Sequence, residues 1–198
     1  YITLETRYGA SRIATLESGL SPQAGEVIGS AVVVPTGSPL RTLDDLRQHR
    51  IVAVAPDAFG GYLIAARELL KHGISPERDL AARQFTGFPV QKLFAALDAG
   101  AADAAIVGSC QMEMLQAQGL IAATGYRVLP PAAPPPAGYR CRVSTPLYPD
   151  WPFATLPGTA HPLSRQVTVA LLTMPRGADG ASFTVPTDYV AVHGLFRD

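Results

Sequence analysis

The sequence predicts an α/β protein built around a mostly parallel sheet. Between residues 50 and 120, short β-branched runs alternate with stretches whose apolar residues recur at helical spacing. Apolar residues make up 47% of the 198-residue chain and charged residues 16%, which is typical of a folded protein with a large buried core. A chain of this length can form one large domain or two smaller lobes.

The charge of the chain is balanced, with sixteen basic and sixteen acidic residues and no run of basic ones. We therefore expect no binding of nucleic acid. The longest apolar candidate, 95–107, is interrupted by Asp98 and Asp103, so we expect no membrane span. Because the chain begins at Tyr1 with neither Met nor a signal-peptide pattern, we expect a processed or excised piece of a longer protein.

The elements expected before residue 50 are the end of a helix, two strands and a short helix. Gly9 is placed to end the first helix, and a proline ends the second strand. Thr42 is predicted to cap the short helix, with Asp45 at the third position as in a capping box. These elements are expected at 1–9, 11–17, 31–35 and 42–47.

From residue 50 onward, strands and helices alternate regularly. We expect strands at 51–55, 84–86 and 103–107, and helices at 61–72, 89–99 and 109–118. His72 and Gly73 close the first of these helices, and Pro89 lies in the first turn of the second. Alternation of this kind favours a mostly parallel sheet with helices on its faces.

The alternation stops at a proline cluster, 130–136, which can be neither helix nor central strand. We interpret this cluster as a stiff surface connection, and we expect the main boundary between two lobes at 130–138, with a weaker boundary at 18–30. Beyond it the sequence predicts an extended segment and two helices. These lie at 139–147, 162–173 and 188–196.

Residue patterns for catalysis or metal binding are not recognisable. The chain contains no nucleophile elbow, phosphate loop, zinc-protease motif or dinucleotide fingerprint. Asp44 and Asp45 need only a helix-dipole explanation. We therefore expect neither an enzyme nor a cofactor, although an enzyme with a buried titratable pair stays an alternative. No histidine has a partner at metal-ligand spacing; the four are His49, His72, His161 and His193.

Three turns at the carboxyl ends of predicted parallel strands form the candidate ligand site. Open α/β sheets bind ligands at these ends, where each following helix presents free N–H groups and a positive dipole end to an anion. Each turn could equally be a purely structural connection. The candidate residues are Ala58, Phe59, Gly60, Gly61, Tyr62, Thr86, Gly87, Phe88, Gly108 and Ser109.

A series of motifs resembles the type II periplasmic binding proteins, most closely their phosphonate-binding group. The motifs occur in the family's order at 29–35, 38–47, 51–62, 85–88 and 97–107. The resemblance implies two α/β lobes: lobe I from 1–30 and 141–198, and lobe II from 31–140. Lobe I would lack its N-terminal half, which the family carries before the position of Tyr1. We therefore expect an unpaired strand edge and exposed apolar faces on 1–16 and 162–173.

Further motifs are similar to the extracytoplasmic sensor region of histidine kinases of the tetrathionate-sensor type. They lie at 12–17, 108–110, 139–153 and 185–196. This similarity implies a periplasmic, two-component sensor domain attached to a transmembrane kinase, which closes on a small anionic ligand between its lobes. We expect either a second chain, as in a homodimer, or an N-terminal segment that preceded Tyr1 to cover the incomplete lobe. The alternative is the substrate-binding component of a phosphonate- or phosphate-type ABC transporter, and the sequence beyond residue 198 would distinguish the two.

Two expectations depend on this resemblance. Phosphonate-binding proteins carry a hydroxyl-rich Ser-Thr-Ser-Gly turn where this chain has 58–61, so only backbone N–H donors remain and phosphonate is not implied as the ligand. Cys110 and Cys141, the only cysteines, border the proline-rich connection. The oxidising periplasm that the resemblance implies favours a disulfide between them, and two buried thiols are the alternative.

Overall fold

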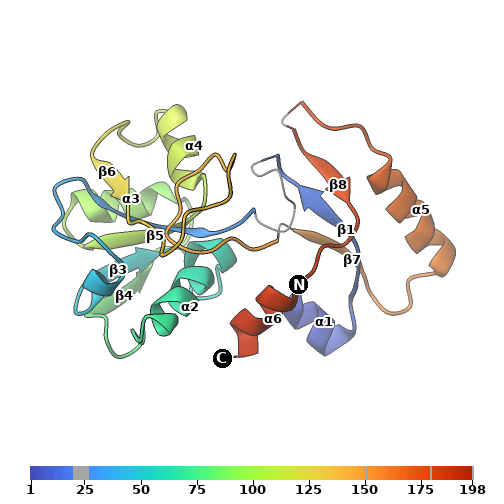
Figure 1. Cartoon of the computed structure of the whole chain (residues 1–198), viewed down its shortest axis with the longest axis horizontal. Coiled ribbons are helices and arrows are strands. Elements are labelled where there is room, and N and C mark those ends of the chain that lie inside the picture. Colours follow the sequence, from blue (N-terminus) through green and yellow to red (C-terminus); the bar gives the residue numbers. More distant parts are fainter. Residues whose placement is uncertain (20–26, 150, 179, 198) are drawn as a thin grey trace. The chain divides into compact units, whose positions relative to one another are not determined.

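The structure, a computed structural model, describes residues 1–19, 27–149, 151–178 and 180–197 (Figure 1). The chain forms two compact units. Unit 1 comprises Tyr1–Val27, Pro136–Tyr139 and Leu147–Asp198, and unit 2 comprises Ile28–Pro135 and Arg140–Pro146. Each unit contains a sheet of its own, so the α/β class predicted from the sequence is confirmed.

Unit 2 contains a five-stranded mixed sheet in the order β4-β3-β5-β2-β6. Strand β3 pairs in parallel with β4 and β5, whereas β2 runs antiparallel to β5 and β6. The prediction of a mostly parallel sheet is therefore wrong for β2, because the direction of β2 depends on its pairing with β5, more than seventy residues away in the chain. The strands are β2 (Ser30–Pro35), β3 (Arg50–Ala53), β4 (Ala82–Phe85), β5 (Ala104–Gly108) and β6 (Tyr126–Val128).

Helices cover both faces of this sheet, with α2 on one face and α3 and α4 on the other (Figure 1). Successive strand residues point to opposite faces, so Val32 packs with Leu69 of α2 while Val33 packs with Phe94 of α3. All four of these side chains are buried. The helices of unit 2 are η1 (Asp44–Leu46), the π-helix η2 (Phe59–Leu63), α2 (Ile64–Lys71), α3 (Gln91–Asp98) and α4 (Gln111–Ala117).

Unit 1 contains a three-stranded antiparallel sheet in the order β7-β1-β8. Strand β1 has the predicted bounds, whereas β7 and β8 are too short to stand out as strands in the sequence. No described residue of α5 is buried, and Leu163 and Val169 are exposed, as expected for the apolar face of 162–173. The elements are α1 (Ile2–Tyr8), β1 (Ser11–Glu17), β7 (Pro152–Thr155), α5 (His161–Leu172), β8 (Ser182–Thr184) and α6 (Val190–Arg197).

Polar and aromatic contacts hold the smaller core of unit 1 together. The guanidinium carbon of Arg12 lies 4.6 Å from the ring centroid of Tyr189 and 5.6 Å from that of Tyr1. Arg12 also donates a hydrogen bond to the Thr187 carbonyl at 2.6 Å. The expected exposure of 1–16 is only partial, since Leu4 and Tyr8 are exposed but Ala14 and Ala10 are buried.

The helix ends follow the sequence with one exception. Gly9 ends α1 in the left-handed conformation at φ 65°, as predicted, and its N–H bonds to the Glu5 carbonyl. The predicted Thr42 cap is confirmed only in part: η1 begins at Asp44 with Leu43 as its N-cap, and the Thr42 side chain caps no helical N–H group. The expected contact of Asp45 is present, because its carboxylate accepts the backbone N–H groups of Arg41 and Thr42 at 2.8 and 2.9 Å, and these bonds lower the pKa of Asp45.

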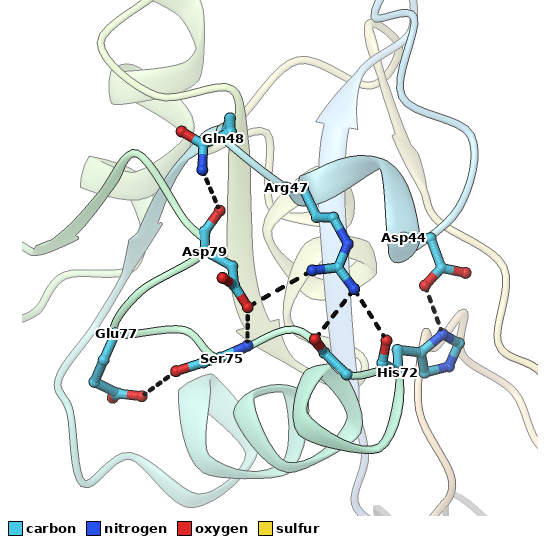
Figure 2. A network of polar contacts seen from close by, with 8 residues as sticks. Asp44, Arg47, Gln48, His72, Ser75, Glu77 and Asp79 are labelled. Carbon is cyan, nitrogen blue, oxygen red and sulfur yellow. Dashed lines mark hydrogen bonds and ion pairs between the residues drawn. The ribbon is translucent and has the colours of Figure 1, made fainter.

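A polar network joins η1 to the C-terminal end of α2 (Figure 2). His72, the C-cap of α2, places its Nδ1 atom 3.1 Å from Asp44 Oδ1. Arg47 donates to the carbonyls of His72 and Gly73 at 3.4 and 3.1 Å and lies 3.6 Å from an Asp79 carboxylate oxygen. The network thus places a cationic guanidinium against the two carbonyls that directly follow α2, which the helix dipole favours.

None of the helices in the described ranges has the length and apolar character that crossing a bilayer requires.

An ion pair at the start of β3 yields a test of acid stability. Asp103 accepts three hydrogen bonds from Arg50: from the backbone N–H at 2.8 Å, from Nε at 3.1 Å and from a terminal nitrogen at 2.7 Å. The guanidinium bonds hold the pKa of Asp103 below its usual value. Because the folded-state pKa is the lower one, this stabilisation is complete above the unfolded pKa, near 4, and is lost as the pH falls below it.

We expect Asp103→Asn to lower the free energy of unfolding by about 1 kcal/mol at pH 7, since solvent screens a pair whose Arg50 side chain is 44% exposed. Urea unfolding at pH 7 and pH 3 measures the effect, and the difference between the two proteins should shrink at pH 3. Asp57→Asn is the control, because Asp57 is exposed and forms no side-chain bond with a described residue. An equal acid loss in the wild type and Asp103→Asn would contradict the assignment.

Candidate functional site

The three predicted turns lie at one edge of the unit 2 sheet. Strands β4, β3 and β5 are neighbours and run parallel, and Ala53 of β3 pairs with Phe85 of β4 and Ile106 of β5. Their carboxyl ends therefore meet at the same edge. The turn at 58–62 follows the middle strand, and the turns at 86–88 and 108–109 follow its two neighbours.

The middle turn is the start of a π-helix, η2, which the sequence does not distinguish from an ordinary α-helix. The Leu63 N–H donates to the Ala58 carbonyl, five residues back, at 3.0 Å. Helix α2 continues directly from η2, so one helical run spans 59–71. Single π-turns are rare and often mark functional sites.

Gly60 fits this turn because three backbone segments meet there. A Cβ atom at Gly60 would lie 3.2 Å from Ile28 Cγ2, 3.3 Å from the Gly29 carbonyl oxygen and 3.4 Å from Gly108 Cα. Two of these neighbours are backbone atoms that cannot rotate away. The structure thus brings Gly60 and Gly108 together, and the contact requires the absence of a side chain at position 60.

The N–H groups of Gly60 and Gly61 have no hydrogen-bond acceptor among the described residues. Both glycines are half-buried and begin the helical run 59–71, where the backbone dipoles sum to a partial positive charge. Two unpaired donors at a positive helix end form an arrangement that can hold an anion.

The aromatic side chains of this region have different roles. Tyr62 is 5% exposed, its ring packs edge-on against Phe85 with centroids 5.1 Å apart, and its hydroxyl accepts a hydrogen bond from Arg83 at 3.2 Å. The Tyr62 side chain therefore belongs to the core and does not face a ligand. Phe59 is half-buried and Phe88 is 72% exposed, so Phe88 is the more accessible of these two candidate residues.

The turn at 86–88 offers fewer free donors than predicted. The N–H groups of Thr86 and Gly87 donate to the carbonyls of Ala53 and Val54 at 3.1 and 2.9 Å, which prolongs the pairing of β4 with β3. The exposed Lys92 donates from Nζ to the Phe88 carbonyl at 2.8 Å and supplies a positive charge here. In the sequence, the signal that could have pointed to Lys92 as a site residue is its position four residues after Phe88.

The turn at 108–109 is also bonded internally. The Gly108 N–H donates to the Gln111 side chain at 2.9 Å, and the Ser109 N–H donates to the Gly29 carbonyl at 2.9 Å. The Ser109 hydroxyl accepts the Gly29 N–H at 3.2 Å. Gly108 and Ser109 therefore support the middle turn. Of the donors on these two residues, the Ser109 hydroxyl proton is the one that could still bind a ligand.

Sequence reasoning missed the contribution of Ser30. This residue is fully buried, donates from Oγ to the Gly60 carbonyl at 2.6 Å and pairs with Gly108 across the sheet. Because β2 is antiparallel to β5, the first residues of β2 lie at the carboxyl edge of β5. A mostly parallel sheet would have placed them at the opposite edge.

The predicted disulfide between Cys110 and Cys141 is confirmed, with Cα atoms 5.0 Å apart. Within the described ranges, no three His, Cys, Asp or Glu side chains gather in a way that could hold a metal ion. The ligand position between two lobes stays a prediction.

Comparisons with known proteins agree on the family. A family model described as the periplasmic substrate-binding protein of a phosphonate ABC transporter matches residues 1–190. The tetrathionate sensor histidine kinase TtrS of Salmonella typhimurium is 36% identical over the whole of this chain, which spans 33% of that protein. The family model that matches therefore describes a binding protein.

Solved structures with the same fold include two proteins that hold a small molecule. The Xanthomonas citri protein XAC2383, bound to ATP, has a TM-score of 0.70 at 17% identity, covering 98% of this chain and 71% of that one. PhnD1 from Prochlorococcus marinus, in complex with methylphosphonate, has a TM-score of 0.68 at 12% identity, covering 99% of this chain and 74% of that one.

We expect Gly60→Ala to destabilise unit 2 by about 1–2 kcal/mol, because the added methyl group would press against the backbone of Gly29 and Gly108. Gly37→Ala is the matched control: no atom lies within 4 Å of a Cβ there and its φ is not positive, so its effect should stay within about 0.5 kcal/mol. Urea unfolding of both variants measures the difference. Equal free energies of unfolding for the two variants would show that position 60 can accept a methyl group.

Proposed function

Because this chain belongs to the phosphonate-binding family of periplasmic substrate-binding proteins, we propose that it is the extracytoplasmic ligand-sensing domain of a two-component sensor histidine kinase. The support is its 36% identity, over its full length, to a tetrathionate sensor kinase. Since the chain spans about a third of that relative, the attachment to a transmembrane kinase and the periplasmic location are part of the proposal. Units 1 and 2 would correspond to the two lobes.

The observation that carries the proposal is that the N–H groups of Gly60 and Gly61 have no acceptor in the part of the chain that the structure describes. Helix N-termini bind anions through such donors and through the helix dipole. Lys92, in the first turn of α3, donates to the Phe88 carbonyl of the neighbouring turn and adds a positive charge. We propose that a small oxyanion binds at this turn, with Phe59 and Phe88 as its apolar walls.

The chemistry of the turn favours a fully ionised anion. The Gly60 carbonyl already accepts the Ser30 hydroxyl, so the free groups of the two glycines are donors. A sulfur oxyanion such as sulfate or tetrathionate presents only acceptors, whereas a protonated phosphonate also carries a hydroxyl that needs an acceptor. We therefore propose sulfur oxyanions as the preferred class, in line with the name of the relative.

The alternative function is that of a substrate-binding component of a transporter, which the family description favours. The full-length protein distinguishes the two: autophosphorylation that changes with the oxyanion supports the sensor, and a full-length protein without a kinase supports the transporter component. The homodimer stays a prediction, for which the exposed apolar residues of α5 are the supporting observation.

Anion binding can be measured by calorimetry with tetrathionate, sulfate and methylphosphonate. We expect binding of at least one oxyanion, and Lys92→Gln should weaken it about two- to fivefold, as for an exposed ion pair. Arg78→Gln removes the same charge from an exposed residue that precedes β4, at the other edge of the sheet, and should leave the affinity unchanged. No binding of any of the three anions, or equal effects of both substitutions, would contradict the site.

A further inference from the structure

We propose that the Cys110–Cys141 disulfide positions the anion site by holding Cys110 in a left-handed backbone conformation, so that anion affinity falls when the disulfide is reduced. The inference rests on the proposed function, because it concerns the same turn at Gly60. It adds Cys110 as a positioning residue and a dependence of binding on thiol redox state.

The backbone of Cys110 is unusual. Its φ and ψ are 67° and −12°, and Gln48 is the one other non-glycine residue with positive φ in the described ranges. This conformation is unfavourable for an L-residue, so it persists only where the surroundings impose it. Glycine adopts it freely. Cys110 directly follows Gly108 and Ser109 and is the N-cap of α4. The disulfide is the covalent restraint at this position.

From Cys110, one chain of contacts leads to the site. Ser109 is fastened to Gly29 by two hydrogen bonds, and the backbones of Gly29 and Gly108 border Gly60. If Cys110 leaves the left-handed region, the direction of the chain at Ser109 changes and these contacts have to shift.

From Cys141, a second chain of contacts leads to the same place. The Ser144 N–H donates to the Ser30 carbonyl at 2.8 Å, and the Thr145 hydroxyl accepts the Ser30 N–H at 2.9 Å. Ser30 in turn donates from Oγ to the Gly60 carbonyl at 2.6 Å. The disulfide therefore joins the segment that contains Ser109 to the segment that contains Ser144 and Thr145. Both segments bond to residues that contact Gly60.

The same two segments have another connection that does not involve Cys110. Arg142 donates from its backbone N–H and from Nε to Glu113 Oε1, both at 3.1 Å. The connecting segment should thus stay on α4 after reduction, while the backbone of Cys110 is free to relax. Both cysteines are half-buried, so a reductant can reach them. Dithiothreitol supplies the two electrons and two protons, forming two thiols and its own cyclic disulfide.

Two double variants separate backbone geometry from the cross-link. Cys110→Ala with Cys141→Ala, and Cys110→Gly with Cys141→Ala, both lack the disulfide, but only glycine adopts the left-handed conformation freely. We expect sulfate affinity to fall at least fivefold in the alanine variant and in dithiothreitol-treated wild type, and to stay within twofold of the oxidised wild type in the glycine variant. Arg142→Gln, the matched control, should bind as wild type does.

Backbone amide exchange at Gly60, Gly61 and Ser109 provides a readout that does not need a ligand. It should accelerate in the alanine variant and much less in the glycine variant, with near-UV circular dichroism showing that both are folded. Equal affinity and exchange in the two double variants would overturn the inference, whether both match the wild type or both lose binding. If oxidised wild type binds no oxyanion, the proposed function fails, and the exchange rates alone then decide the role of Cys110.

Discussion

Gly60 lies where the start of β2, the end of β5 and the first turn of the helix after β3 converge, and its missing side chain is what lets them approach. The Gly29 carbonyl and Gly108 Cα stand within 3.4 Å of the place where a Cβ would be. Around this point, Ser30 binds the carbonyl of the turn and Ser109 binds Gly29. Contacts within unit 2 therefore hold the Gly60 carbonyl in place, while the N–H groups of Gly60 and Gly61 have no acceptor among the residues that the structure describes.

The regular part of unit 2 could be predicted from the sequence because each of its elements is encoded locally. Alternating apolar runs and helical spacing predicted β3, α2, β4, α3, β5 and α4, with ends shifted by up to three residues. The direction of β2 could not be read in the same way, since it depends on pairing with residues more than seventy positions away. Strands β7 and β8 have only four and three residues, too few for a periodic signal.

The candidate site shows the same division between local and distant information. The position of the turns is set by strand ends and glycines, which are local features. The inward orientation of Tyr62 depends on Arg83 and Phe85 of the neighbouring strand, and the part played by Ser30 depends on the direction of β2. In each case the deciding partner belongs to another segment of the chain, so inspection of the turn alone could not reveal it.

The open donors of the Gly60 turn are main-chain groups, and this has a consequence for how such a domain can diversify. No substitution removes a peptide N–H except proline, so the element that recognises negative charge persists while the residues around it vary. Phe88 and Lys92 are exposed and lie on the neighbouring segment, whereas Gly60 lies against the backbone of Gly29 and Gly108. A lineage could therefore exchange one oxyanion for another by altering these side chains, and would keep the underlying receptor geometry unchanged.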